Sequence, residues 1–402
     1  MMIKVTIGIV TILAMVGVYF GVQANHIDVP QRQNGAPVVF SDQRVLLELW
    51  GRYKQDILEP GTLRALDGHQ DNATTSEGQS YTMMRAAWMD DRTTFDAAWK
   101  WTKDNMQRDD KLMSWSFGKL PDGSYGIQSD RGGQNTATDA DVDIAYALIM
   151  ASNRWKDDTY LYDAQAIVQS VWEKEVVMIN DKPVLVANDI ERLNTVSVVV
   201  NPSYFAPYAY RVFAELNPEN DWKALADNSY SLLFASADAT LDKNTSAGLT
   251  PNWVRVDRST GAVTPDTRLD TNYGYDAFRT AWRLTLDYKY NKDVRAQQVL
   301  KKYTTLDNDW RDNKKLASVY SHDGKVVTDE SVPASYGASI GHFIINDPDR
   351  AKEIYEQKLL PNYDPDTQGW KQKLAYYDDN WAWFGMALYL NQLPNIAGSY
   401  GS

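Results

Sequence analysis

The distribution of apolar residues constrains the fold of this chain more than any other feature of its sequence. From Ser41 onward, apolar residues recur with the 3.6-residue period of an α-helix, with a break near Asp90. The helical stretches cover 45–58, 86–101, 144–150, 160–173, 203–215, 221–236, 275–289, 293–305, 334–345, 349–357 and 380–390. The pattern predicts an all-α fold of about eleven or twelve helices, with one small hairpin over Val176 to Val186 that turns at Asn180-Asp181.

The helical stretches belong to a single domain, because no linker rich in Pro, Gly or Ser interrupts residues 41–395. Two architectures accommodate so many helices: an open solenoid, or helix pairs closed into a double-ring barrel. A solenoid shows a recurring consensus, and this chain has no sequence repeat. Closure also brings remote segments to one end of the molecule, so we expect the barrel.

The first residues carry the pattern of an export signal. After Lys4, Val5 to Val22 are eighteen consecutive uncharged, mainly apolar residues. That length lies between a signal-peptide core and a short transmembrane helix. We interpret residues 1–24 as a signal peptide, with a cleavage site at Val22-Gln23-Ala24, or as a signal anchor, and residues 25–40 as a tether. The protein is therefore expected outside the cytoplasm, either secreted or associated with the outer face of the cell membrane.

Composition excludes several classes of function. The net charge of -12 and the lack of clustered Lys and Arg argue against nucleic-acid binding. The four histidines are too dispersed for a zinc motif, no phosphate-binding fingerprint is present, and no metal or cofactor is expected. The string GASIG (337–341) matches a hydrolase nucleophile motif, but no strand precedes it. The 14 Trp and 24 Tyr, against 10 Phe, suit sugar rings as well as a core.

The string ATTSEGQSY (73–81) places a single carboxyl at the start of a predicted helix. Glu77 is surrounded by small hydroxyl and amide side chains that only donate and accept hydrogen bonds, which suits a held, partly desolvated acid. The alternative is an acid favoured by the helix dipole, with Thr75 or Ser76 as the cap.

A second acidic motif, ATDADVDIA (137–145), leads into a predicted buried helix with three carboxyls at alternate positions. A calcium loop would need Gly and Glu where the chain has Ile144 and Met150, so that interpretation fails. A solvated helix cap is the alternative. Three like charges so close repel one another, and no Lys or Arg lies between Asp139 and Arg154. A polar site that uses an ionised carboxylate explains the motif better.

The third motif, YGYDAFR (273–279), again places an acid at a predicted helix start, and Asp276 and Arg279 can pair across one turn. The pair is either a surface salt bridge or an arginine that keeps a functional carboxylate ionised. Further aromatic strings are MSWSFG (113–118), NPSYFAP (201–207) and YYDDNWAWFG (376–385). Core packing is the alternative for each of their rings, and Trp383 and Phe384 are assigned to the core.

These motifs, in this order, resemble glycoside hydrolase family 8, which includes endoglucanases, xylanases, lichenases and chitosanases. The resemblance runs from Trp50 to Leu390 and implies an (α/α)6 barrel. It makes Glu77 the general acid and Asp276 the general base, although other branches of the family take the base from a different loop. Asp139 is expected to hold the distorted sugar at the point of cleavage.

Arg279 matches the arginine that accompanies the base. The resemblance further makes Trp115, Tyr204 and Tyr377 candidate sugar platforms, with Tyr275 and Asp141 as additional substrate contacts. Because the family inverts, a water must fit beside the base, and the two carboxyl groups are expected roughly 6.5–9.5 Å apart.

The expected protein is a monomeric inverting endo-β-1,4-glycanase that acts on an extracellular polysaccharide, most simply a cellulose-like β-glucan. Xylan and chitosan remain alternative substrates. A second hypothesis is a membrane-tethered accessory of exopolysaccharide synthesis that trims or binds nascent polymer. A third, a catalytically silent binding protein, is disfavoured by the presence of both Glu77 and Asp276.

Overall fold

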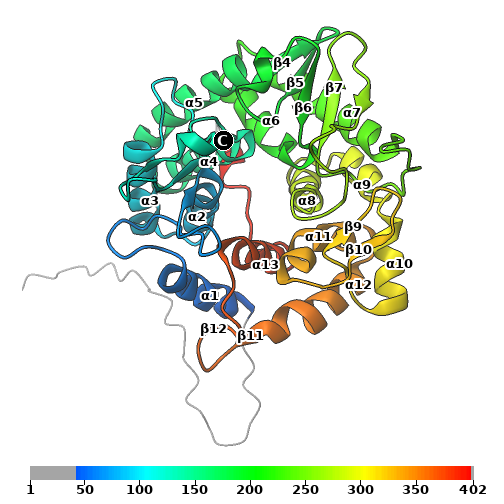
Figure 1. Ribbon diagram of the computed structural model, residues 1–402. Coiled ribbons are helices and arrows are strands. Elements are labelled where there is room, and N and C mark those ends of the chain that lie inside the picture. The colour runs from blue at the N-terminus through cyan, green and yellow to red at the C-terminus, as the bar shows by residue number, and fades with distance from the viewer. Residues whose placement is uncertain (1–41, 400–402) are drawn as a thin grey trace, which may run out of the picture. The chain divides into compact units, whose positions relative to one another are not determined.

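Two concentric rings of α-helices make up most of the computed structural model, which describes residues 42–399 (Figure 1). The inner ring consists of α2 (Ser76–Trp88), α4 (Thr138–Trp155), α6 (Pro207–Leu216), α8 (Arg279–Asn291), α11 (Pro333–Asn346) and α13 (Tyr376–Tyr389). The outer helices are α1 (Asp42–Asp56), α3 (Arg92–Asn105), α5 (Thr159–Glu175), α7 (Trp222–Asp238), α9 (Val294–Leu300), α10 (Thr304–Asn313) and α12 (Pro348–Ile354).

The inner ring closes on itself. Each inner helix contacts the next one along the chain, and α13 returns to contact α2. Outer helices α3, α5, α7, α9 and α12 each pack on the inner helix before them, while α1 packs on α13. The predicted double-ring barrel is thus confirmed as an (α/α)6 barrel.

Burial explains why each helix joins its ring. In α4, every residue from Thr138 to Ser152 is buried, as expected for a helix surrounded by protein. Outer helix α3 instead buries one face, with Phe95, Ala98, Trp99 and Thr102 spaced three or four residues apart. The sequence pattern therefore distinguishes the inner helices from the outer ones.

Two of the predicted helices have wrong bounds. The stretch 293–305 divides into α9 and α10, because α9 ends at Leu300 and α10 starts at Thr304. The stretch 349–357 begins as α12 and continues as a π-helical turn over Tyr355–Leu359. Apolar spacing alone does not mark such breaks, because buried residues three or four positions apart occur on both sides of them, as in α9 and α10.

The predicted hairpin is confirmed as β4 (Val176–Ile179) and β5 (Lys182–Leu185), which pair antiparallel. Asn180 and Asp181, with φ of 50° and 59°, form the two-residue turn. The structure adds β1 (Thr74–Thr75), β2 (Ser116–Lys119), β3 (Tyr125–Ile127), β6 (Ser197–Val200), β7 (Val254–Asp257), β8 (Val263–Thr264), β9 (Val319–Tyr320), β10 (Val326–Thr328), β11 (Tyr363–Asp364) and β12 (Gly369–Trp370). Sequence reasoning missed these strands because two to four residues are too few to show a period of two.

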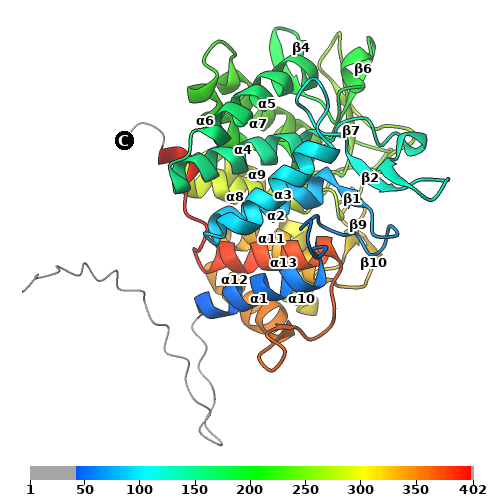
Figure 2. The same ribbon diagram turned by 90° about the vertical axis from the view of Figure 1, so that its left-hand side faces the viewer.

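Most of these strands gather at one end of the helical rings (Figure 2). β1 runs directly into α2, and the loops after β6 and before β7 lie at the same end. The small sheets therefore hold the loops at the end of the barrel where inner helices α2 and α4 begin.

Glycines let α11 and α13 approach backbone to backbone. A Cβ atom on Gly337 would lie 2.0 Å from the carbonyl oxygen of Trp381, and one on Gly385 would lie 2.3 Å from Cα of Gly337. Neither contact can relax by a side-chain rotation, because the obstructing atoms belong to the main chain. The string GASIG therefore lies inside α11 as a helix-packing surface and not at a strand-to-helix turn.

Within residues 42–399, no helix is both long enough and apolar enough to cross a membrane. The predicted signal peptide or anchor over 1–24 and the tether over 25–40 lie outside the described residues. The compact unit that contains the barrel begins at Ser41.

We expect Gly337→Ala to lower the free energy of unfolding by about 1–3 kcal/mol, because the methyl group forces the two helices apart. Gly51→Ala is the matched control, since Gly51 lies in outer helix α1 with nothing within 4 Å of the added Cβ. That change should leave stability unchanged or raise it by roughly 0.5–1 kcal/mol. Urea unfolding of both variants checks this, and equal effects would contradict the proposed helix contact.

Candidate active site

Glu77 lies in the first turn of α2, but its side chain does not cap the helix. Thr75 is the cap, and its hydroxyl oxygen accepts a hydrogen bond from the Gly78 amide. The Glu77 carboxyl accepts from Arg279 Nη1 at 2.5 Å and from the Tyr376 hydroxyl at 2.8 Å. The acid is thus held by side chains from α8 and α13, about 200 and 300 residues further along the chain.

Asp139, in the first turn of α4, shares that arginine. Its Oδ2 accepts from Arg279 Nη1 at 2.6 Å, and its side chain is 2% exposed. One turn further, Asp143 receives two hydrogen bonds, of 2.7 and 2.6 Å, from Arg283. The arginines and the aspartates are each four residues apart, so two arginines of α8 balance two carboxylates of α4. The charge repulsion noted in the sequence is compensated across the barrel.

Asp276 lies in the turn that precedes α8, three residues before the helix starts. The Trp253 indole donates to Oδ2 at 3.1 Å, while Asn201 Nδ2 and Arg279 Nη2 lie 3.4 Å from Oδ1. Its side chain is 38% exposed, against 19% for Glu77. Water therefore reaches Asp276 more easily than it reaches Glu77.

The Arg279 guanidinium connects all three acids. It bonds Glu77 and Asp139 through Nη1 and approaches Asp276 through Nη2, and the Tyr204 ring lies 5.0 Å from it. The sequence pointed to Asp276 as the main partner of Arg279. The structure corrects that emphasis, because the two closest contacts go to Glu77 and Asp139.

Burial and shared charge set the protonation of this cluster. Burial, reinforced by the Asp139 carboxylate, raises the pKa of Glu77 to about 7, and Arg279 opposes that rise. Burial also raises the pKa of Asp276, while Arg279 and the Trp253 hydrogen bond oppose it. One cation cannot neutralise three ionised carboxylates, so a proton on Glu77 near neutral pH relieves the excess negative charge.

The predicted aromatic residues fall into two groups. Tyr204 is 9% exposed and packs against Arg279, so it supports the guanidinium from behind. Tyr275 is 42% exposed, and its carbonyl oxygen accepts a hydrogen bond from the Tyr377 hydroxyl. Trp115 is half-buried, and its carbonyl oxygen accepts from the Ser76 amide, one residue from Glu77. Of these residues, Tyr377 is close enough to Arg279, Glu77 and Asp276 to interact with their charges. Backbone hydrogen bonds hold Tyr275 and Trp115 near the same segments.

Asp141, predicted as a substrate contact, is not brought to this cluster. Its side chain is fully buried, and Oδ1 accepts from the Met113 amide at 2.8 Å. Burial and the nearby Glu175 carboxyl raise its pKa. In a helix, residues two apart point in nearly opposite directions, so Asp141 faces the outer ring while Asp139 faces the barrel axis. We therefore correct that prediction.

Three residues at the site escaped sequence reasoning as individual residues: Tyr376, Trp253 and Asn201. Tyr376 and Asn201 belong to aromatic strings noted in the sequence, but from those strings only Tyr377 and Tyr204 were predicted as site residues. The position of each residue around the helix could have distinguished Tyr376, the first residue of α13, from Tyr377, because neighbours in a helix point in different directions. Trp253 carries no local signal, because only the pairing of β6 with β7 brings it near Asp276.

Among residues 42–399, no cluster of acidic or histidine side chains has the arrangement of a metal site.

One carboxyl whose pKa burial raises to about 7 and one more exposed carboxyl, both bonded to one arginine at the end of an (α/α)6 barrel, suit a glycoside hydrolase. The model of the glycosyl hydrolases family 8 matches residues 29–381, and the chain belongs to that family. This membership confirms the resemblance seen in the motifs.

The relatives include Endoglucanase A of Acetivibrio thermocellus, 28% identical over 296 residues that cover 71% of this chain and 57% of that protein. The probable endoglucanase of Novacetimonas hansenii is 29% identical over 66% of this chain and 72% of its own length. This chain thus spans little more than half the length of the first of these relatives. Among solved structures, the endo-1,4-D-glucanase from Vibrio fischeri ES114 superposes with a TM-score of 0.71 at 23% identity, covering 85% of this chain and 94% of that one. That likeness supports the fold.

We expect Tyr376→Phe to move the alkaline limb of the pH–activity profile upward. With Glu77 as the expected general acid, the limb marks loss of its proton as the pH rises through its pKa, and the Tyr376 hydrogen bond lowers that pKa. Tyr377→Phe is the control, since the Tyr377 hydroxyl bonds a backbone carbonyl and not Glu77. Profiles of kcat/KM for both variants and the parent check this. A downward shift in Tyr376→Phe would contradict the assigned contact.

Proposed function

We propose that this protein is an inverting endo-β-1,4-glucanase in which Glu77 is the general acid and Asp276 the general base. The observation that carries the proposal is the pair of carboxyl groups bonded to different nitrogens of Arg279, one largely enclosed and one open to solvent. Hydrolysis of a glycosidic bond needs one protonated and one ionised carboxyl on opposite sides of the bond. The arrangement around Arg279 supports both requirements.

In the proposed reaction, Glu77 gives its proton to the glycosidic oxygen as the bond to the anomeric carbon breaks. A water attacks that carbon from the opposite face, and its proton passes to Asp276. One water is consumed, and solvent later returns the proton from Asp276 to Glu77. The product carries the inverted anomeric configuration.

Asp139 contributes through its position beside the acid. Its Oδ2 is bound to Arg279, whereas Oδ1 is buried and has no hydrogen-bond partner among residues 42–399. A sugar hydroxyl that reached Oδ1 would satisfy it and be held next to Glu77. This is the role that the resemblance to glycoside hydrolase family 8 implies for Asp139, the retention of a distorted sugar ring.

The names of the relatives support a β-glucan as the substrate. Both relatives compared above carry endoglucanase names, and the structural neighbour from Vibrio fischeri is described as an endo-1,4-D-glucanase. A structural neighbour described as a cold-adapted family 8 xylanase, with a TM-score of 0.68 at 18% identity, keeps xylan as the alternative substrate. We further propose an extracytoplasmic location, on the basis of the apolar run from Val5 to Val22.

We expect Glu77→Gln to lower kcat on soluble cellulose derivatives by about 10²–10⁴-fold, because the amide keeps the shape of the side chain but cannot donate the proton as an acid. Thermal unfolding should show that the variant stays folded. The control is Glu215→Gln, an exposed acid at the end of α6, which should retain the parent rate.

Proton NMR of fresh parent digests should show the α-anomer first, as inversion of a β-linkage requires. A Glu77→Gln variant that cleaved at the parent rate, or an initial β-anomer, would contradict the proposed mechanism.

A further inference from the structure

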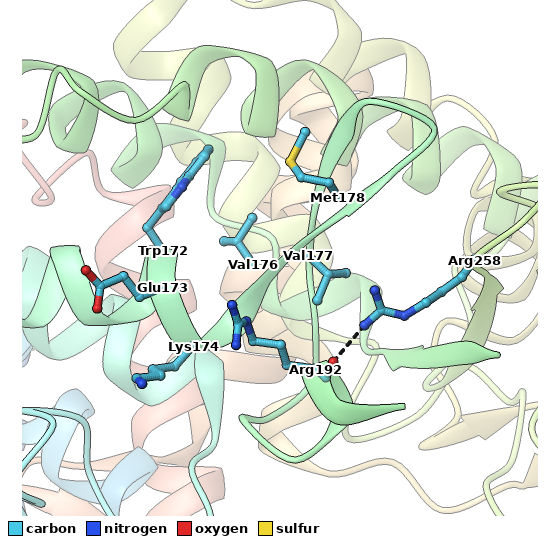
Figure 3. Close-up of a pocket in the computed structure, with 8 residues that line it drawn as sticks. All are labelled: Trp172, Glu173, Lys174, Val176, Val177, Met178, Arg192 and Arg258. Atoms are coloured by element: carbon cyan, nitrogen blue, oxygen red, sulfur yellow. Dashed lines mark hydrogen bonds between the residues drawn. The ribbon is translucent and has the colours of Figure 1, made fainter. Parts of the chain in front are cut away.

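A surface pocket of about 740 Å³ lies between the end of α5, strand β4, the short helix η2 (Glu191–Leu193) and the loop that follows β7 (Figure 3). Its lining is Trp172, Glu173, Lys174, Val176, Val177, Met178, Arg192 and Arg258. None of these residues belongs to the carboxyl cluster, and the proposed hydrolysis uses none of them.

The pocket is cationic in a protein of net charge -12. Arg192, Arg258 and Lys174 contribute three positive charges, and Glu173 is the single acid of the lining. Across residues 42–399, these three cations form no ion pair. Most buried or half-buried arginines of this barrel are paired with carboxylates, as Arg279 and Arg283 are. The pocket therefore offers free positive charge.

The backbone, not a carboxylate, holds Arg258 in place. Its Nη2 donates to the carbonyl oxygen of Arg192 at 2.8 Å, and its buried Nε has no hydrogen-bond partner among the described residues. This bond ties Arg258 to the backbone of η2, while the Arg192 side chain extends toward Val176 (Figure 3). A guanidinium oriented in this way is suited to bind a carboxylate or a phosphate.

An indole and a thioether supply apolar surface beside these charges. The half-buried Trp172 ring is held from behind by Trp222, with ring centroids 5.1 Å apart at 62°. Met178 is 55% exposed on β4. An aromatic face next to guanidinium groups suits a pyranose ring that carries an anionic group better than it suits a free inorganic ion.

A short ladder connects this pocket with the carboxyl cluster. At one end of the β6–β7 pair, Val200 pairs with Val254, next to Asn201 and Trp253, which contact Asp276. At the other end, β7 finishes at Asp257 and Arg258 follows directly. The four residues of β7 lie between Trp253 and Arg258, so the Cα atoms of these two residues are about 17 Å apart. A polysaccharide of a few sugar units covers such a distance.

We propose that this pocket binds an anionic substituent, a carboxylate or a phosphate, on a sugar unit of the polysaccharide that the enzyme hydrolyses. The proposal rests on the proposed glucanase function and adds charge to the description of its substrate. The two arginines, one exposed and one half-buried, favour a polymer that carries anionic groups over a bare glucan.

The test compares two soluble polymers with the same β-1,4-glucan backbone, anionic carboxymethyl cellulose and neutral hydroxyethyl cellulose. In Arg192→Gln/Arg258→Gln, KM for carboxymethyl cellulose should rise about three- to tenfold at low salt, with kcat unchanged. KM for hydroxyethyl cellulose should not change. Lys301→Gln/Lys352→Gln, which removes one exposed charge just after α9 and one in α12, is the matched control and should leave both values unchanged.

An unchanged KM for carboxymethyl cellulose, or an equal rise with both polymers, would overturn the proposal. A parent enzyme that cleaved neither polymer would instead refute the glucanase function, so the two failures are distinguishable. Affinity electrophoresis of Glu77→Gln in polygalacturonate separates a further case. Polygalacturonate could retard the protein, and the two arginine changes could abolish that retardation, while KM for carboxymethyl cellulose stays unchanged. That combination would show that the pocket binds a separate acidic polymer, and it would contradict a contact with the hydrolysed substrate.

Discussion

The contact of one guanidinium with three carboxyl groups holds the candidate active site together. Arg279 is almost fully buried and lies within 3.4 Å of Glu77, Asp139 and Asp276, which come from three different segments of the chain. Two charges 4 Å apart attract by about 4 kcal/mol at an effective dielectric constant near 20. The arginine therefore holds the ends of α2 and α4 and the turn before α8 together, and it leaves the cluster with more acid than base.

The excess acid gives the cluster its chemistry. Burial raises the pKa of Glu77 to about 7, so this carboxyl retains a proton under conditions in which exposed glutamates have lost theirs. Burial raises the pKa of Asp276 as well, but its side chain is more exposed, and Arg279 and Trp253 oppose the rise. The proposed mechanism uses the combination of protonated Glu77 with ionised Asp276. In that proposal, two similar side chains take opposite roles because their surroundings differ.

The rest of the inner ring supports this cluster with further buried ion pairs. Arg283 binds Asp143 one turn below Arg279, and Arg85 of α2 binds Asp379 of α13 at 2.8 Å. Removing one partner of such a pair typically costs about 3–5 kcal/mol, because the other charge stays buried and unpaired. These pairs and the glycine contact between α11 and α13 fix the inner helices, and so they fix the directions of the site residues.

The sequence was sufficient for the features that depend on local pattern. Helical period revealed the helices, and Glu77, Asp139 and Asp276 stood out because each occupies a short acidic motif at or near a helix start. Features that depend on tertiary contacts were not accessible in this way. The partners of Arg279 come from α2 and α4, Trp253 reaches Asp276 through a strand pair of four residues, and Asp141 points away from its neighbour Asp139 because of helical phase.

The most direct test of this account is a carbon-13 NMR titration of the Glu77 carboxyl in the parent protein, with Glu77→Gln to assign the resonance. The account predicts that Glu77 ionises at a pH of about 7. Ionisation near 4.5, together with the exposed glutamates, would show that Arg279 keeps all three acids charged and would contradict the proposed proton donor.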